Sequence, residues 1–275
     1  MMDHYTSEIH GTLNSKKGSD GTYIARIRVS KPCSISSDGR SSTAKMLFDE
    51  DGDLIRSTEE ESVILLKHSG SSSLQDVGSQ LWGGSLLLAD MILAHPEFLL
   101  QGNVLEIGSG TGLTPIGAAI CLPSTSFSSY IVTDLEQNLD GIRHNFALNH
   151  VKYEDSKCFS IRSLDLLLSS KFPKWAQEAD VVLGGDVIYD EVLTNGIIAF
   201  ILSLKEGAVL YFAIEKRYVF TNEDLDIVSH SYNYFLQGLN HHGIPFEEMD
   251  PLPTQSFCYE RSRDLILLRI MKQKR

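Results

Sequence analysis

The sequence predicts an α/β protein with a mostly parallel central sheet. From Val77 onward, short apolar runs alternate with amphipathic stretches of helical period, which is the pattern of successive βαβ units. The apolar runs contain few polar residues, as central parallel strands do when helices cover both faces of the sheet. These strand candidates are NVLEIG at 103–108, SYIVTD at 129–134, DVVLGGD at 180–186 and AVLYFAI at 208–214.

Helical periodicity between and after these runs predicts two amphipathic helices. Apolar residues three or four positions apart lie on one face of a helix. The two sets are Leu135, Leu139, Ile142 and Phe146, and then Leu225, Val228, Tyr232 and Phe235. The last segment, at 246–271, contains a proline turn and ends in an apolar run, which predicts an antiparallel hairpin that closes the sheet.

The first 74 residues are rich in serine, glycine and charge, and they predict a small β-rich appendage. Apolar and polar residues alternate in TYIARIRVS at 22–30, which indicates a half-buried strand. Asp51–Gly52 lies between two apolar stretches and is a hairpin signal, and SVILLKH at 62–68 has the composition of another strand. A Ser/Gly cluster follows, so we predict an appendage at 1–74 and a second domain at 75–275.

Composition limits the classes of partner. The chain has 275 residues and a formal net charge of −12, which disfavours direct binding of nucleic acid and favours a basic protein or peptide. The four cysteines form no C-x-x-C pair, which indicates reduced thiols in the cytosol or nucleus. The N-terminal residues lack the profile of a signal peptide. Charges interrupt the most apolar window, at 81–100, too early for a membrane span.

Three glycines, Gly108, Gly110 and Gly112, follow the predicted strand that starts at Asn103. Glycine permits left-handed turns and close approach of a ligand to the backbone, and the helix that follows offers free amides at its N-terminus. A dinucleotide fingerprint would need glycine or alanine at Leu113, and a phosphate-binding loop would need a Gly-Lys-Ser/Thr triplet that this stretch lacks. Both of these nucleotide-binding interpretations are therefore disfavoured.

Acidic residues on both sides of this loop favour S-adenosylmethionine as its ligand. Glu106 lies within the strand before the loop, and Asp134 lies at the end of the next strand. A carboxylate at this second place can accept hydrogen bonds from both ribose hydroxyls of the cofactor. A tight turn without a ligand is the alternative interpretation of the glycines.

Adjacent histidines, His241 and His242, stand in a polar stretch near the C-terminus. Protein metal sites take three or more side-chain ligands, and no third ligand accompanies this pair. We therefore predict that the two histidines are solvated and that the chain holds no metal.

Four segments carry a resemblance to a known family. They are DVGSQLWGGSLLLADMI at 76–92, VLEIGSGTGL at 104–113, VTDLEQNLDGIRHNFALN at 132–149 and DVVLGGDVIYD at 180–190. Together they resemble the protein-lysine methyltransferase group of the seven-β-strand, S-adenosylmethionine-dependent methyltransferases. The resemblance extends over roughly residues 75 to 270, and it implies a Rossmann-like sheet of seven strands and methylation of a protein lysine.

The resemblance also implies roles for single residues. The backbone of Gly108 to Gly110 would cradle the methionine part of the cofactor, and Asp165 would lie near the adenine amine. The group commonly has tryptophan after this aspartate, whereas this chain has Leu166, whose side chain can still cover an adenine face. Together with Glu106, the implied cofactor-binding residues are Trp82, Gly108, Ser109, Gly110, Asp134, Asp165, Leu166 and Gly185.

Two of these implications have structural alternatives. Trp82 would close the cofactor pocket from the N-terminal side, but a tryptophan before a helix also fills space in a core. Asn145 and Asn149 recur in the group's helix after the second strand, and a helix cap explains Asn149 equally well.

The group carries an Asp-x-x-Tyr motif after its fourth strand, which corresponds here to Asp186 and Tyr189. Both lie beyond the carboxyl end of a predicted parallel strand, where such sheets place active sites. Methyl transfer to lysine depends mainly on positioning a neutral amine. We therefore assign these two residues to catalysis, through orienting the amine and shaping its channel. For Asp186, an N-cap of the following helix is an alternative that is compatible with this role.

Two other functions stay open at this point. The first is a methyltransferase for nucleic-acid bases or small molecules. An enzyme that N-methylates bases would usually carry Asn or Asp followed by Pro-Pro and an aromatic residue, which GDVIYD at 185–190 lacks. A non-catalytic scaffold that binds S-adenosylmethionine would tolerate loss of Asp186 and Tyr189, which are present. The expected enzyme is a monomer in the cytoplasm and nucleus, and its substrate is a basic protein that associates with nucleic acids.

Overall fold

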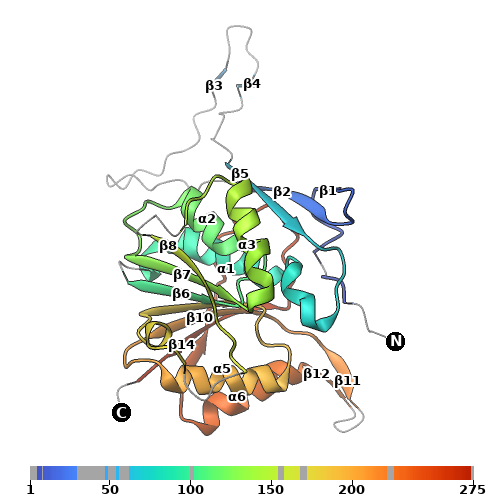
Figure 1. The fold of residues 1–275 in the computed structure, drawn as a ribbon. Coiled ribbons are helices and arrows are strands. Elements are labelled where there is room, and N and C mark those ends of the chain that lie inside the picture. Colours follow the sequence, from blue (N-terminus) through green and yellow to red (C-terminus); the bar gives the residue numbers. More distant parts are fainter. Residues whose placement is uncertain are drawn as a thin grey trace.

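A seven-stranded sheet forms the centre of the protein in the computed structural model (Figure 1). The structure describes residues 5–7, 9–29, 47–48, 54–55, 62–99, 102–153, 158–167, 172–221 and 226–273. The strands of the sheet are β6 (Asn103–Ile107), β7 (Ser129–Asp134), β8 (Phe159–Ser163), β9 (Val181–Gly185), β10 (Val209–Glu215), β13 (Phe246–Glu248) and β14 (Leu265–Met271). Their order across the sheet is β13-β14-β10-β9-β6-β7-β8.

The sheet is parallel except at its C-terminal edge. β6 pairs in parallel with β7 and β9, and these pair in parallel with β8 and β10. β14 runs antiparallel between β10 and β13. The α/β class, the mostly parallel sheet and the antiparallel C-terminal pair predicted from the sequence are therefore confirmed.

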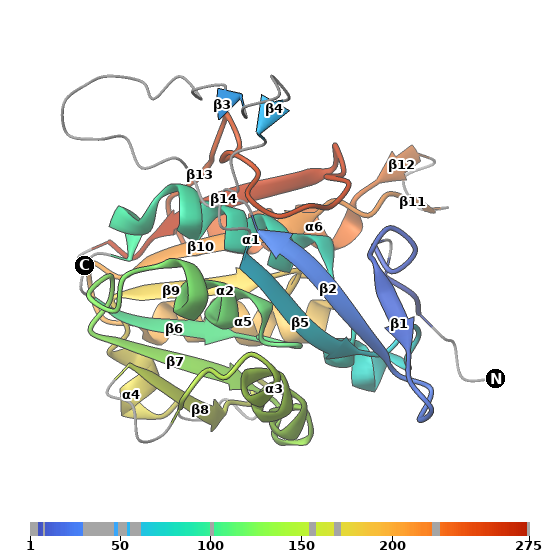
Figure 2. The ribbon, with the colours of Figure 1, turned by 90° about the horizontal axis from the view of Figure 1, so that it is seen from above.

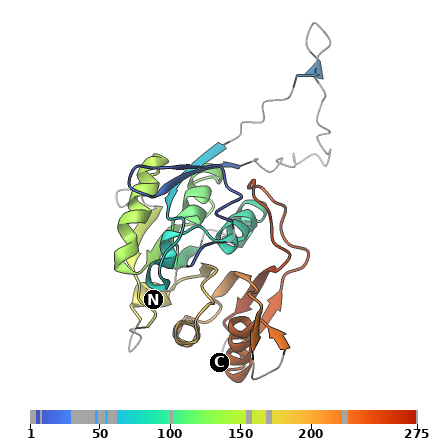
Figure 3. The same cartoon turned by 90° about the vertical axis from the view of Figure 1, so that its right-hand side faces the viewer.

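Helices cover both faces of this sheet (Figures 1 and 3). The helices are α1 (Gly83–Ala94), α2 (Leu113–Cys121), α3 (Glu136–Leu148), α4 (Lys174–Gln177), α5 (Glu191–Ser203) and α6 (His230–His241), with two short 3-10 helices, η1 (Leu74–Ser79) and η2 (Pro96–Phe98). The first three α-helices share one hydrophobic cluster and the last three share another. None of the helices in the described residues has the length and apolar content needed to cross a membrane.

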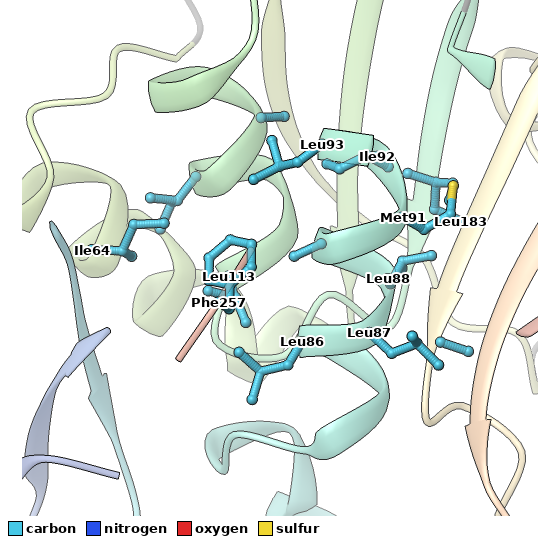
Figure 4. Packing of buried hydrophobic residues seen from close by; sticks show 14 of the residues in the cluster. Ile64, Leu86, Leu87, Leu88, Met91, Ile92, Leu93, Leu113, Leu183 and Phe257 are labelled. Atoms are coloured by element: carbon cyan, nitrogen blue, oxygen red, sulfur yellow. The ribbon is translucent and has the colours of Figure 1, made fainter. Parts of the chain in front are cut away.

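Helix α1 is apolar around most of its circumference because it lies between layers of the core. Ten of its twelve residues are buried. Figure 4 shows its leucines and Met91 between Leu183 of β9 on one side and Ile64, Leu113 and Phe257 on the other. A helix that is hydrophobic all round is expected to be buried, and the most apolar window of the sequence is accordingly a core helix.

Asp90 is the charged residue within this helix, and it is fully buried. Its carboxylate accepts hydrogen bonds from the backbone N–H groups of Ser256 and Phe257, from the Tyr259 hydroxyl and from Arg261. Burial raises the pKa of Asp90, and the two backbone N–H groups and Arg261 oppose that shift. A buried carboxylate is tolerated when it is hydrogen-bonded and paired. Through these hydrogen bonds, Asp90 holds the segment before β14 against α1.

The first part of the chain forms a three-stranded antiparallel sheet in the order β1-β2-β5. Its strands are β1 (Ser15–Lys17), β2 (Tyr23–Val29) and β5 (Ser62–His68). Both strands predicted in this part, at 22–30 and 62–68, are confirmed. Ala25, Ile27 and Val29 are buried on one face of β2, as their alternation with polar residues predicts.

Two pairs of very short strands complete the described elements. β3 (Leu47–Phe48) pairs with β4 (Leu54–Ile55) across the predicted hairpin, whose turn at Asp51–Gly52 lies outside the described residues. β11 (Val219–Thr221) pairs with β12 (Asp226–Val228).

The second predicted helix starts later than its apolar stripe indicated. Val228 belongs to strand β12, Leu225 lies outside the described residues, and α6 begins only at His230. The prediction is therefore wrong for the first half of the stripe. Phe235, in its second half, is fully buried in the helix.

Two asparagine side chains of α3 bind the outer edge of β5. Asn145 accepts a hydrogen bond from the N–H of Lys67 and donates to its carbonyl, at 2.7 and 3.0 Å, and Asn149 does the same with Leu65, at 2.9 and 2.6 Å. Asn145 also donates to the carbonyl of Thr111 in the glycine loop, at 2.8 Å. An edge strand exposes unpaired N–H and C=O groups, and these amides pair with them as a neighbouring strand would.

The N-terminal sheet packs as a further layer on α2 and α3 (Figure 2). Its buried residues belong to the same hydrophobic cluster as those of α1 and α2.

Asn149 does stand at the C-terminal end of α3, as the cap interpretation predicted, and its side chain also binds β5. The domain boundary after residue 74 stays a prediction.

We predict that Asn145→Ala lowers the free energy of unfolding by about 1–3 kcal/mol, because the partly buried backbone groups of Lys67 and the buried carbonyl of Thr111 lose their partner. Asn145 itself is 1% exposed. Urea unfolding followed by circular dichroism measures the change. The matched control is Asn233→Ala at an exposed place on α6, which should change stability by less than about 0.5 kcal/mol. Equal effects of the two substitutions would contradict this role of Asn145.

Candidate active site

The glycine loop between β6 and α2 passes three times through the left-handed region. Gly108, Gly110 and Gly112 have φ angles of 59°, 56° and 79°, which are unfavourable for residues with a Cβ. A Cβ on Gly108 would lie 2.8 Å from the side chain of Val187, and one on Gly110 would lie 3.0 Å from the carbonyl oxygen of Gly78. Backbone conformation and close packing therefore both require the glycines that the sequence analysis singled out.

Asp134, at the end of β7, holds this loop in place. Its Oδ2 accepts a hydrogen bond from the N–H of Gly110, and its Oδ1 accepts from the N–H of Leu135 and the side-chain amide of Asn138, all at 2.7 Å. Asp134 is 6% exposed, and burial raises its pKa. A carboxylate has about four acceptor places, so one remains for a ribose hydroxyl while these three bonds are kept.

The loop opens onto a cavity of about 420 Å³ at the carboxyl ends of the parallel strands, a size within the usual range for small-molecule sites. Most of the predicted site residues line this cavity. They are Trp82, Gly108, Gly110, Asp134, Asp165, Leu166, Gly185, Asp186 and Tyr189. Leu164 and Leu167 add apolar surface beside Asp165 and Leu166. The structure therefore brings together residues that are up to 107 positions apart, from Trp82 to Tyr189.

Glu106 and Ser109, which the sequence analysis placed among the cofactor-binding residues, do not line this cavity. Glu106 is 2% exposed. Its carboxylate accepts hydrogen bonds from the Tyr130 hydroxyl at 2.5 Å and the Ser109 hydroxyl at 3.2 Å. Burial raises the pKa of Glu106 to about 7. These contacts place Glu106 and Ser109 behind the loop, where they brace it from inside the sheet.

Asp186 follows β9 in a left-handed conformation, with a φ angle of 53°. Its carboxylate accepts hydrogen bonds from the N–H of Gly84 at the start of α1, at 2.6 Å, and from the N–H of Glu215 at the end of β10, at 2.9 Å. A Cβ on Gly84 would lie 2.7 Å from Cγ of Asp186, and one on Gly185 would lie 2.9 Å from Cα of Ser85. Glycine at these two places lets α1 approach the ends of both strands.

The N-cap of α5 is Asp190, whose side chain accepts a hydrogen bond from the N–H of Leu193 at 2.9 Å. The cap interpretation of Asp186 is therefore wrong, because its carboxylate binds α1 and β10 instead.

Tyr189, which lies between Asp186 and Asp190 in the sequence, is half-buried. Desolvation raises the pKa of Tyr189 above its ordinary value of 10.0, so its hydroxyl is neutral at physiological pH.

A second cavity, of about 340 Å³, adjoins the first, and we call it the vestibule. The two cavities share Val77, Trp82, Asp186, Tyr189 and Asp190. The other residues that line the vestibule are Tyr5, Thr6, Ile188, Glu215, Arg217, Ser229, His230, Ser231 and Tyr232. Its lining carries three carboxylates against one guanidinium, so its charge suits a cationic group.

Trp82 stands in the wall between the first cavity and the vestibule. We call the first cavity the cofactor cavity, after the ligand that the sequence predicts. Its Nε1 donates a hydrogen bond to the carbonyl of Val77 at 2.9 Å, which fixes the plane of the ring. The guanidinium of Arg217 lies over that ring at 4.7 Å, an arrangement in which the ring quadrupole attracts the cation. Trp82 is half-buried, so it both fills space and presents an aromatic face.

Several lining residues of the first cavity are absent from the sequence analysis. They include Gly78, Gln137, Asn138, Leu193 and Ile197. Asn138 could have been found, since it lies in the first turn of the predicted helix that follows Asp134. The contribution of Gly78 depends on its contact with Gly110, which no local pattern shows. Among the described residues, no group of three or more His, Cys, Asp or Glu side chains is arranged to hold a metal ion.

Comparisons with known proteins agree with this geometry. A family model described as lysine methyltransferase matches residues 60–231. Methyltransferase-like protein 22 of Mus musculus is 33% identical over 82% of this chain and 64% of its own length, and that of Homo sapiens is 29% identical over 77% and 58%. Protein-lysine N-methyltransferase EEF2KMT of Mus musculus is 28% identical over 78% of this chain and 64% of its own length. The chain thus spans less than two thirds of these relatives.

The fold, the glycine loop and the cavity agree with the family that the comparison identifies. Since the family match covers more than half of the residues, the chain belongs to the lysine methyltransferase family. The cofactor cavity fits S-adenosylmethionine. It combines a glycine loop without side chains, a carboxylate at the end of β7 and apolar surface after β8. The glycine loop and Gly185 would hold the methionine part, Asp134 the ribose, and Asp165 with Leu166 the adenine.

We predict that Asp134→Ala weakens S-adenosylmethionine binding about ten-fold or more, because buried donors of the loop and the ribose lose a partner worth about 1–3 kcal/mol. Isothermal titration calorimetry measures the affinity. Asp140→Ala, at an exposed place on α3 that does not line the cofactor cavity, serves as the control and should leave the affinity unchanged. Unchanged affinity in Asp134→Ala would remove this residue from the site.

We predict that Glu106 makes the protein less stable as the pH rises. Its pKa of about 7 in the folded protein exceeds its ordinary 4.5, so folding favours the protonated carboxyl. The free energy of unfolding should fall between pH 4.5 and about 7, by at most about 1.4 kcal/mol per unit, and this contribution should level off above that range. The side chain of Glu106→Gln stays neutral, so this variant should lack the part of the pH dependence that comes from residue 106.

Urea unfolding of both proteins at several pH values tests this. Asp90 and Asp134 also have pKa values raised by burial, so their contributions appear in both profiles. The informative quantity is therefore the difference between Glu106→Gln and the wild type, which should increase with pH. A constant difference would show that the carboxyl of Glu106 does not titrate in this range.

Proposed function

We propose that this chain transfers a methyl group from S-adenosylmethionine to the side-chain amine of a lysine in a protein substrate. The observation that carries the proposal is the wall shared by the cofactor cavity and the vestibule, which contains Trp82, Asp186 and Tyr189. A donor in one cavity and an acceptor in the other would meet at this wall. Relatives such as EEF2KMT, which is named a protein-lysine N-methyltransferase, support the same activity.

The residues of the wall provide what a lysine acceptor needs. When bound, S-adenosylmethionine would supply an activated methyl group. The lone pair of a neutral lysine amine would form the N–C bond as the C–S bond breaks, which leaves S-adenosylhomocysteine and a methylated ammonium that can release a proton to water. A lysine amine ordinarily has a pKa near 10.4. Desolvation in the vestibule lowers the pKa of the amine, whereas the carboxylates of Asp186, Asp190 and Glu215 raise it. The neutral hydroxyl of Tyr189 can accept a hydrogen bond from the amine and thereby aim its lone pair.

Asp186 has a different part in this proposal. Both of its oxygens accept hydrogen bonds from backbone N–H groups, those of Gly84 and Glu215. It therefore fixes the wall in place, and its negative charge, with that of Asp190, attracts the incoming ammonium. Its assignment as a catalytic residue stays a prediction.

We further propose that the substrate is a basic protein that associates with nucleic acids, and that the chain acts as a monomer in the cytoplasm and nucleus. The net charge of −12 and the excess of carboxylates in the vestibule support a basic substrate. The chain's own acidity disfavours nucleic acid as a direct partner. Sedimentation velocity at micromolar concentration tests the monomer, which a dimer peak would contradict.

One labelling experiment tests activity and substrate together and shows which extract contains the substrate. Separate nuclear and cytosolic extracts are incubated with the protein and S-adenosylmethionine carrying a labelled methyl group, and then treated with nuclease or protease. Label should survive nuclease, disappear with protease and map by mass spectrometry to a lysine of a basic protein in at least one extract. Label on RNA or on a metabolite would overturn the proposal, and label on an acidic protein would overturn its second part.

We predict that Tyr189→Phe lowers kcat for the protein substrate about ten-fold, because one hydrogen bond to the amine is worth roughly 1 kcal/mol or slightly more. Cofactor affinity should stay within about two-fold. Tyr234→Phe on α6, which removes a hydroxyl outside both cavities, is the matched control. Full activity of Tyr189→Phe would exclude the hydroxyl from orienting the acceptor.

A further inference from the structure

The wall of the vestibule includes residues from the N-terminal part of the chain. Tyr5 and Thr6 line it together with Trp82, Glu215 and Arg217. Tyr5 is 42% exposed, and Thr6 is also exposed. Neither of them lines the cofactor cavity. These two side chains thus face the acceptor side of the site and not the donor side.

Hydrogen bonds from Gln80 fasten this segment beside the vestibule. Gln80, which is 1% exposed, accepts from the N–H of Ser7 at 2.8 Å and donates to the carbonyl of Tyr5 at 3.0 Å and the hydroxyl of Ser72 at 2.7 Å. Tyr5 and Ser72 also exchange two backbone hydrogen bonds, at 2.8 and 3.0 Å. The hydroxyl of Ser7 donates to the carbonyl of Leu81. The backbone is therefore fixed, while the outward side chains stay open to a partner.

The chemistry of the vestibule indicates what that partner carries. Its charged lining is mainly acidic, with Asp186, Asp190 and Glu215 against Arg217. The stacking of Arg217 on Trp82 shows that a guanidinium fits over an aromatic face here. Tyr5 offers a second aromatic ring at the edge of the same cavity, and cations are attracted to such faces.

We propose that Tyr5 and Thr6 contact the residues that flank the target lysine, and that Tyr5 receives an arginine or lysine side chain of a basic peptide segment. This inference rests on the proposed function, because it needs the vestibule to be the acceptor side. It gives residues of the N-terminal part a direct role in selecting the substrate. Gln80 acts through them as a positioning residue.

Two synthetic peptides serve as probes, one with a single lysine flanked by arginines and one with the same lysine flanked by glutamines. Their binding to the full chain is measured by calorimetry in the presence of S-adenosylhomocysteine, so the readout does not depend on turnover. The wild type should bind the arginine-flanked peptide more tightly. Tyr5→Ala should weaken that binding about three-fold to five-fold and leave the binding of the glutamine-flanked peptide unchanged.

Two further variants separate a direct contact from a general disturbance. Ile24→Ala truncates a side chain of similar exposure, 37%, that lines neither cavity, and it should bind both peptides as the wild type does. Gln80→Ala should lose the preference for arginine flanks although its own side chain does not line the vestibule. Affinity for S-adenosylhomocysteine should stay within about two-fold in all three variants.

The outcomes distinguish this inference from the proposed function. Equal binding of both peptides to the wild type, or an unchanged preference in Tyr5→Ala, would overturn the inference even when the lysine is methylated. Binding that depends on Tyr5 without any methylation of protein lysines in the extracts would leave the contact established and overturn the proposed function.

Discussion

The close approach of helix α1 to the ends of β9 and β10 is the constraint on which the site depends. It needs Gly84 and Gly185, because a Cβ on either would overlap the opposing backbone or side chain. The carboxylate of Asp186 then satisfies the N–H groups of Gly84 and Glu215, which would otherwise lie unpaired in a crowded place. With α1 fixed there, Trp82 at its N-terminus stands between the two cavities. The geometry of donor and acceptor thus follows from one helix end.

Buried carboxylates stabilise the loops around this helix. Asp134 binds the glycine loop, Glu106 supports it from behind, and Asp90 fastens the segment before β14. Each is desolvated, which raises its pKa, and each receives several donors that oppose this effect. Fully satisfied polar networks of this kind are rigid. The loop conformation needed for the cofactor is therefore largely formed by the chain's own hydrogen bonds, which reduces the ordering required on binding.

Features that depend on local pattern were predictable from the sequence, and those that depend on tertiary pairing were not. The apolar runs that became β6, β7, β9 and β10 show their burial directly in composition, and the glycine spacing with Asp134 located the cofactor cavity. The partners of Asp186 lie 102 and 29 residues away. The sequence of the following helix therefore could not show that Asp186 binds α1 and β10 and does not cap that helix. The sequence analysis placed Glu106 among the cofactor-binding residues. Its burial behind the loop could not be predicted without knowing how Tyr130 packs against it. The helix predicted from the apolar stripe that starts at Leu225 was partly wrong, because over a few residues the spacing of apolar residues does not distinguish a helix from a short strand.

The asparagine amides on α3 have a consequence for synthesis of the chain on the ribosome. Leu65 of β5 leaves the ribosome 84 residues before Asn149, its partner. At about 5–20 residues per second, the edge of β5 waits roughly 4 to 17 seconds for the side chains that pair with it. During this interval the nascent N-terminal sheet presents open N–H and C=O groups on a strand with buried Ile64 and Leu66, the kind of edge to which other chains add. Protection by chaperones would matter most at this stage of synthesis, before helix α3 is complete.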